Sequence, residues 1–363
     1  MKNLGFGCMR LPLLSEKNSD IDLEQFKKMV DIYLEKGFTY FDTAYRYHEG
    51  QSEIAVREGL VKRYPRDAFT ITSKMPLAIV EKKEDLETIF ADQLEKIGID
   101  HFDYYLLHNI NDTTYDTAKN TEAFTFLSGL KEKGLTKHIG FSFHGTPEML
   151  DEILSNHPEI EFVQIQLNYL DWTSANVQSG KCYEVIRKYN KNVLVMEPIK
   201  GGKLAKVPAE VEKMFKDYDP NASVASWAVR FAASLPGVYM VLSGMSNLEQ
   251  LEDNTTYMED FKPLNDEEKA IVEKAAEIIT AQNAIPCTAC RYCVEGCPMQ
   301  IAIPEYFNLY NDDKKKNAYD QVVARGNGKA SDCIKCGACE VACPQHLKIR
   351  DYLADLIVPK FEA

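Results

Sequence analysis

The end of this 363-residue chain contains the same cysteine pattern twice. Each copy reads C-x2-C-x2-C-x3-C-P, and together they use eight of the ten cysteines: Cys287, Cys290, Cys293 and Cys297, then Cys333, Cys336, Cys339 and Cys343. Three cysteines in one tight turn, with a fourth before a proline, are typical ligands of a [4Fe-4S] cluster. The pattern constrains the fold strongly, because such a short segment has to wrap around its metal groups.

The fourth ligand of each cluster comes from the other motif in two-cluster proteins of this kind. We therefore assign one [4Fe-4S] cluster to Cys287, Cys290, Cys293 and Cys343, and the second to Cys333, Cys336, Cys339 and Cys297. Zinc and disulfides are the alternatives. Structural zinc usually takes paired C-x2-C units rather than three cysteines in one turn, so the spacing favours iron–sulfur clusters.

The sequence predicts a soluble cytoplasmic protein. Its start, MKNLGFGCMRLP, has no basic flank followed by an apolar run, so we expect neither a signal nor a transit peptide. No apolar run approaches the ~20 residues that span a bilayer. Thiolate ligands persist in a reducing cytoplasm, where disulfides are rare, and we expect the remaining Cys8 and Cys182 to be buried packing residues.

The net charge of the protein limits the kinds of partner that it can bind. A net charge of −13 argues against general binding to nucleic acid or to an anionic membrane surface. Lys314, Lys315 and Lys316 form a local exception. They indicate either a solvated face or a docking site for an acidic, ferredoxin-type electron carrier.

Over most of the chain, short apolar runs alternate with longer amphipathic stretches. Helical patterns cover Leu23–Glu35, Lys83–Lys96, Glu122–Lys133 and Ser223–Ala233. The expected strands are Leu4–Cys8, Phe38–Phe41, Phe69–Ser73, Tyr104–Leu107, Ile139–Ser142, Val163–Leu167, Val193–Met196 and Val238–Leu242. Repeated β-then-α units indicate parallel strands, and eight of them predict an α/β protein with a closed (β/α)8 TIM barrel.

A further helix, over Asn265–Ala281, leads into the first cysteine motif. We therefore expect a barrel domain over residues 1–280 and a small iron–sulfur domain over residues 281–363. The 35 residues between the motifs (298–332) include helical patterns at Glu305–Tyr310 and Asn317–Ala324. Such a spacer is long for a compact β-sheet ferredoxin and favours a mainly helical ferredoxin-like domain.

Active sites of such barrels lie at the carboxyl ends of the strands. Four polar side chains follow the second to fourth strands there: Asp42, Tyr47, Lys74 and His108. A phenol can protonate a carbonyl oxygen while a hydride reaches its carbon, and a lysine beside it lowers its pKa. Asp42 can hold Lys74 in place and charged, while His108 can position the substrate oxygen.

Each of these residues alone has a structural explanation as a cap, a surface lysine or a packing residue. Their order along successive strand ends favours catalysis instead. Tyr45 is a rival phenol in the same loop, and the spacing favours Tyr47.

The sequence resembles the aldo-keto reductase family in GFTYFDTAYRYHEGQSE, ITSK, YYLLHNI and KGLTKHIGFSFH. The resemblance spans roughly the first 260 residues, the length of one barrel. It implies that Tyr47 is the general acid, assisted by Lys74, Asp42 and His108. The whole chain is similar to the subfamily that carries a C-terminal two-cluster ferredoxin module.

The resemblance also implies a nicotinamide cofactor that extends across the barrel face without a Rossmann motif. The implied cofactor contacts are Ser142 and Gln164 at the carboxamide, Lys200, Gly201 and Gly202 at the pyrophosphate, and Gly244, Gln250 and Asn254 at the adenosine end. The substrate is then a small carbonyl compound or alcohol.

Three departures from the family pattern concern this cofactor site. Phe143 stands where the family usually has asparagine, and Met196 where an aromatic residue usually stacks on the nicotinamide. Members that prefer NADP grip its 2′-phosphate with basic side chains. The matching stretch here offers Gly244, Met245, Asn247 and Gln250, which favours NAD over NADP.

Three functions stay open at this point. The first is a carbonyl or alcohol oxidoreductase that uses nicotinamide, with the clusters serving assembly, regulation or docking. The second places a flavin on the barrel face, wired to the clusters and a ferredoxin-type carrier, because clusters pass electrons singly. The third is a non-enzymatic electron-transfer module on a barrel scaffold, against which the four polar residues argue. A glycosidase that uses Glu49 and Glu197 ranks below all three.

Overall fold

The computed structural model describes residues 2–282, 284–311 and 314–362. Eight parallel strands pair in chain order and close into a barrel, which confirms the predicted (β/α)8 fold. The strands are β1 Leu4–Gly7, β2 Tyr40–Asp42, β3 Thr70–Met75, β4 Phe102–Ile110, β5 Thr136–Phe143, β6 Phe162–Gln166, β7 Asn192–Met196 and β8 Val238–Ser243.

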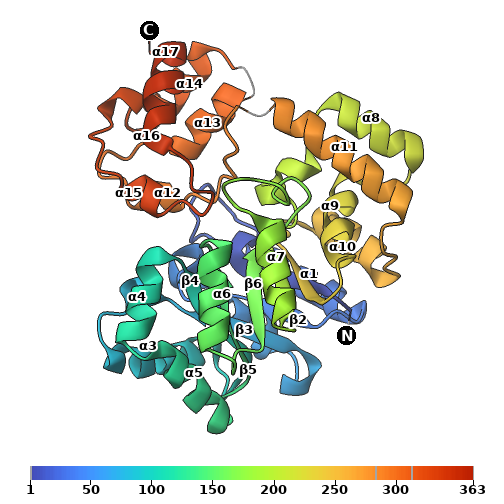
Figure 1. The fold of residues 1–363 in the computed structure, drawn as a ribbon, viewed down its shortest axis with the longest axis vertical. Coiled ribbons are helices and arrows are strands. Elements are labelled where there is room, and N and C mark those ends of the chain that lie inside the picture. Colours follow the sequence, from blue (N-terminus) through green and yellow to red (C-terminus); the bar gives the residue numbers. More distant parts are fainter. Residues whose placement is uncertain (1, 283, 312–313, 363) are drawn as a thin grey trace.

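The helices α1 to α11 surround the barrel or follow it (Figure 1). They are α1 Leu23–Glu35, α2 Gln51–Val56, α3 Lys83–Ile97, α4 Asp112–Asn120, α5 Ala123–Glu132, α6 Pro147–Asn156, α7 Ser179–Lys188, α8 Ala209–Tyr218, α9 Val224–Ala233, α10 Leu248–Glu259 and α11 Asp266–Gln282. Local signals explain several ends. The Asp22 carboxylate accepts a hydrogen bond from the Gln25 amide at the start of α1, and Gly98 at φ 78° terminates α3.

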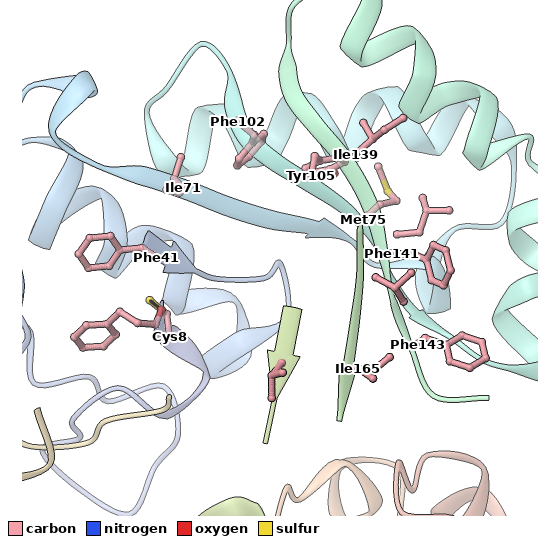
Figure 2. Packing of buried hydrophobic residues seen from close by; sticks show 14 of the residues in the cluster. Cys8, Phe41, Ile71, Met75, Phe102, Tyr105, Ile139, Phe141, Phe143 and Ile165 are labelled. Carbon is pink, nitrogen blue, oxygen red and sulfur yellow. Dashed lines mark hydrogen bonds between the residues drawn. The ribbon is translucent and has the colours of Figure 1, made fainter. Parts of the chain in front are cut away.

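Side chains alternate between the two faces of each strand. On the outer face, apolar side chains such as Phe41, Ile71 and Phe141 pack against the surrounding helices (Figure 2). The interior is filled by Tyr40, Tyr104, Leu106, Phe162, Leu194, Met240 and Leu242. On β2, β4 and β6 the next inward position is polar (Asp42, His108 and Gln164), so the alternation aims these side chains into the open end of the barrel.

Strand β4 is longer than the sequence pattern suggests. It continues through His108 to Ile110, and its pairing with β5 shifts register between Leu107 and Ile110. Asn109 lies within this irregularity at φ 62°, a backbone region that asparagine tolerates. The polar residues there hid the end of the strand from a pattern based on apolar runs.

The tail carries short helices around a core of its own, and Figure 1 shows them gathered at one end of the barrel. They are α12 Tyr292–Glu295, α13 Ile303–Asn311, α14 Lys316–Ala324, α15 Ala338–Val341, α16 Ile349–Tyr352 and α17 Val358–Phe361. Polar contacts join the tail to the barrel. Lys200 Nζ donates to Gln345 Oε1 at 2.8 Å, and Arg46 pairs with Glu295 at 3.3 Å.

Helix α11 leads from the barrel to the tail but packs on the barrel side. Val272, Ala275 and Ile279 share an apolar cluster with Phe215 and Trp227. No helix within the described ranges combines the length and apolar character needed to cross a bilayer. Cys8 and Cys182 are both buried, as the sequence predicted.

Candidate active site

The four residues singled out at the strand ends meet in one place. Asp42 ends β2, Lys74 lies near the end of β3, and His108 lies in the irregular end of β4. Tyr47 opens the short segment η2 (Tyr47–Gly50), which follows β2. Asp42 and His108 each come two residues after a side chain that fills the barrel interior, Tyr40 and Leu106. Both therefore point inward as well.

Lys74 is the centre of this group. Its ammonium donates hydrogen bonds to Asp42 Oδ1 at 2.6 Å, to the Thr43 carbonyl at 2.8 Å and to the Tyr47 hydroxyl at 3.3 Å. Gln164 Nε2 donates to the second Asp42 oxygen at 3.2 Å. Lys74 is fully buried, so the Asp42 carboxylate compensates a cation that is cut off from water.

Tyr47 and His108 face each other edge to face, with ring centroids 5.8 Å apart. Burial raises the pKa of Tyr47 well above its usual 10.0, and the Asp42 carboxylate adds to the effect. Burial lowers the pKa of His108 well below 6.5, and the Lys74 cation adds to that shift. The sequence led us to expect that Lys74 would lower the pKa of Tyr47, but burial raises this pKa instead. Tyr47 is thus held as a protonated phenol beside a neutral imidazole.

These residues open into a cavity of about 300 Å³ at the carboxyl ends of the strands. Asp42, Tyr47 and His108 line it, and so do seven of the eight expected cofactor contacts: Ser142, Gln164, Gly201, Gly202, Gly244, Gln250 and Asn254. Met196 also lines it. The cavity therefore runs from the loop after β2 to the start of α10, an elongated space that fits an extended cofactor.

Lys200 is the expected cofactor contact that the structure places elsewhere. Its side chain is buried, pairs with Asp171 Oδ1 at 2.5 Å and bonds Gln345 of the tail. The Lys200 ammonium therefore lies at the contact between the barrel and the tail. The neighbouring Gly202, at φ 97°, has open space where a Cβ would stand, so an anion can approach its backbone.

Three side chains considered in the sequence analysis do not line the cavity. Tyr45 does not line it; the Lys96 ammonium lies 3.8 Å from its ring centroid. Phe143 is buried in the apolar core outside the barrel, as Figure 2 shows, and the following His144 lines the cavity instead. Glu49 is exposed and outside the cavity, whereas Glu197 lines it. The pair of Glu49 and Glu197 considered for a glycosidase is therefore not assembled in this cavity.

Sequence reasoning missed several residues of the cavity. Arg10, which follows β1, reaches the edge beside Gly244, and its guanidinium bonds the Thr288 carbonyl of the tail at 3.5 Å. Tyr292 and Pro344, both from the cysteine motifs, form part of the wall. No local pattern identifies these residues, because they meet the barrel only through contacts between remote segments.

The two cysteine motifs interleave in the tail. Cys287, Cys290, Cys293 and Cys343 line one cavity, and Cys297, Cys333, Cys336 and Cys339 line another. Within the part of the chain that the structure describes, no three His, Cys, Asp or Glu side chains converge closely enough to hold a single metal ion. Four thiols around a cavity fit a cluster larger than one zinc ion.

The chain matches the aldo/keto reductase family over residues 3–277 and the 4Fe-4S dicluster domain over residues 286–347. It therefore belongs to the aldo/keto reductase family of oxidoreductases and carries a C-terminal 4Fe-4S dicluster domain. This confirms the resemblance drawn from the sequence.

Individual relatives are distant. The NADH-specific methylglyoxal reductase of Escherichia coli (strain K12) is 23% identical over 322 residues, which cover 77% of this chain and 96% of that protein. The probable aldo-keto reductase 1 of Glycine max is 26% identical over 181 residues, which cover 48% of this chain. The match covers 49% of the Glycine max protein, so the chain spans about half the length of that relative.

Solved structures share the barrel. An aldo/keto reductase from Klebsiella pneumoniae, in complex with NADP and acetate, superposes with a TM-score of 0.61 at 18% identity. The superposition covers 75% of this chain and 90% of that one. At this identity the likeness shows the fold.

Proposed function

We propose that this protein reduces the carbonyl group of a small molecule with a nicotinamide cofactor, and that Tyr47 is the proton donor. The observation that carries the proposal is the Lys74 ammonium, 3.3 Å from the Tyr47 hydroxyl and 2.6 Å from Asp42 at the cavity wall. The arrangement gives a protonated phenol, a buried cation beside it and a neutral imidazole opposite.

When bound, the cofactor supplies a hydride to the carbonyl carbon. As the carbonyl oxygen gains negative charge, Tyr47 donates its hydroxyl proton to it, and an alcohol results. The phenolate left on Tyr47 is stabilised by the Lys74 ammonium, which Asp42 keeps in place. His108 positions the carbonyl oxygen. Tyr47 then regains a proton from solvent, and the same steps reversed oxidise an alcohol.

Residues along the cavity supply the contacts that such a cofactor needs. Ser142 and Gln164 lie at the inner end, where the carboxamide would bind. Gly202 and Arg10 lie where the pyrophosphate would pass, and the amino end of α10 brings partial positive charge to the adenosine end.

The choice between NAD and NADP rests on basic groups at this outer end. The sequence favoured NAD because the 244–250 stretch has no arginine or lysine. Arg10 comes from another part of the chain; its side-chain carbons lie beside Gly244 and its guanidinium lies beside Gly201. A basic side chain therefore borders the 244–250 stretch from outside it, and we propose a nicotinamide dinucleotide without a preference.

We also propose that the tail from about residue 281 is a separate domain with the two ligand sets assigned from the sequence. Its support is that each set lines its own cavity and that the tail has its own apolar core, separate from that of the barrel.

One observation favours a second candidate, electron transfer between the clusters and a flavin bound in the barrel cavity. Tyr292, between Cys290 and Cys293, and Pro344, next to Cys343, both line the active-site cavity. The first cysteine set is therefore adjacent to that cavity, and a flavin would convert between single electrons and a hydride. Flavin in protein purified without oxygen would support this candidate, and its absence would count against it.

The test of the proposed function is a pair of matched variants. Tyr47→Phe removes the proton donor and should lower kcat for aldehyde reduction by at least ~100-fold, the usual contribution of a general acid. Tyr45→Phe, in the same loop but outside the cavity, is the control and should keep its activity. Equal activity of Tyr47→Phe and wild type, at equal iron content, would exclude Tyr47 as the acid.

A further inference from the structure

A second cavity, of about 200 Å³, lies between the barrel and the tail. On the barrel side it is lined from Asn109 to Thr113, the end of β4 and the start of α4. On the tail side it is lined by the segment 340–346, which contains the last cysteine of the second motif.

This cavity adjoins the active-site cavity. His144, Tyr292 and Pro344 line both cavities. Asn109 directly follows His108, which faces Tyr47. The second cavity therefore lies next to the place where a substrate carbonyl would meet Tyr47.

The lining of the second cavity can form hydrogen bonds, and its nitrogen bases are the two imidazoles of His144 and the exposed His346. The barrel side offers the Asn109 amide and the Thr113 hydroxyl, whereas the Asn111 oxygen accepts from the Thr113 and Thr114 backbone amides at the start of α4. Within residues 2–282, 284–311 and 314–362, no lysine or arginine lines it. Burial lowers the pKa of His144 to about 4, so this imidazole is neutral near pH 7.

The acidic residues of the lining add to this selectivity. Asp112 is an exposed carboxylate at the rim. Glu340 is already neutralised by Arg350, at 2.7 Å. An anionic group that entered the cavity would lose water without gaining a lysine or arginine partner and would face Asp112. A hydroxyl or amide group would instead find partners on the barrel side and apolar contact with Val341 and Pro344.

We infer that the cavity between barrel and tail receives the distal part of the substrate and selects uncharged carbonyl compounds with hydroxyl or amide groups over those with a carboxylate or phosphate. The inference rests on the proposed function, because it places the reacting carbonyl at Tyr47. It makes the dicluster domain a wall of the substrate site.

The experiment compares ligands of one chain length on the full-length protein with both clusters loaded, in the presence of cofactor. Binding of hexane-1,6-diol and of 6-hydroxyhexanoate is measured by calorimetry, and kcat/KM is measured for hexanal, 6-hydroxyhexanal and 6-oxohexanoate. We expect the diol to bind at least ~10-fold more tightly than the carboxylate, because a nearby unit charge changes affinity by about that factor. We also expect 6-hydroxyhexanal to be the best substrate and 6-oxohexanoate the worst.

Charge reversal at the rim gives a sharper version of the test. Asp112→Lys should raise kcat/KM for 6-oxohexanoate about tenfold relative to that for hexanal, because it places a cation in the cavity. Thr113→Lys is a second variant with the same expected direction. Asp116→Lys, on the same helix but outside the lining, is the control.

Equal or tighter binding of the carboxylate, no detectable binding of either ligand, or no response to either lysine would overturn the inference. Failure of the proposed function has a different signature: the diol still binds more tightly than the carboxylate, but none of the three aldehydes is reduced.

Discussion

At the scale of single residues, Lys74 connects the side chains of the candidate site. It is fully buried and bonded to both Asp42 and Tyr47. Removing one partner of a buried ion pair costs about 3–5 kcal/mol, because the other charge is left without compensation. The pair is therefore tightly coupled, and Tyr47 and His108 take their protonation states from the burial that surrounds it.

The pH profile tests these protonation states. His108 gains a proton only well below pH 6.5, and Tyr47 loses its proton only well above pH 10. We therefore expect kcat/KM for carbonyl reduction to be flat from about pH 7 to 9. Steady-state rates with one uncharged aldehyde across this range provide the measurement. A downward slope that disappears in His108→Asn would show that this imidazole titrates near neutrality instead.

Glu53 shows how burial acts at the scale of an element. It lies in α2, fully buried behind β3, and accepts hydrogen bonds from the Ser73 hydroxyl and the Gln93 amide. Burial raises its pKa from 4.5 to about 7, although both hydrogen bonds oppose the shift. The folded protein therefore holds this proton more tightly than the unfolded chain does.

The free energy of unfolding should consequently depend on pH through Glu53. The stability that this residue contributes is complete below about pH 4.5 and is lost as the pH rises through about 7. Over that window the loss should be about 2–3 kcal/mol. Urea unfolding of wild type and Glu53→Gln without oxygen at pH 5 and 8 measures it, and Glu49→Gln is the exposed control. Identical slopes for wild type and Glu53→Gln would contradict the assignment.

Regular elements were predictable because each depends on a local pattern. The strand beginning at Leu4 and the helix Leu23–Glu35 follow directly from apolar periodicity. Asp42, Lys74 and His108 were predictable for a related reason: parallel strands place their carboxyl ends together. Contacts between remote segments have no such pattern. Arg10 meets Thr288 across 278 positions of sequence, and Lys200 is drawn away from the cavity by Asp171 and Gln345.

At the scale of the whole molecule, the barrel and the tail share one active site. Tyr292 and Pro344 lie in the wall of the cavity, and Gln345 joins Lys200 to Glu197. Gly201 illustrates the close approach, because a Cβ there would stand 2.1 Å from the Thr288 carbonyl oxygen. The order of the tail therefore bears directly on the cavity.

Removal of the clusters should disturb both the fold of the tail and the active-site cavity. We expect chelation to increase hydrogen exchange across residues 284–311 and 314–362, because metal binding is coupled to folding in small metal domains. We also expect KM for an aldehyde to rise about tenfold, equivalent to about 1.4 kcal/mol of lost binding, with less change in kcat. Mass spectrometry before and after chelation, and again after reconstitution, measures the exchange. Unchanged exchange in the tail would mean that its fold does not depend on the clusters.

The most direct test of the account follows the hydride itself. Reduced nicotinamide cofactor labelled with deuterium at the transferred position is given with an aldehyde to the protein purified without oxygen, and the alcohol is analysed by mass spectrometry. Hydride transfer in the Tyr47 cavity predicts one deuterium at the alcohol carbon of each product molecule. An alcohol that carries only solvent hydrogen at that carbon would contradict direct transfer and would show that its electrons arrived by another route.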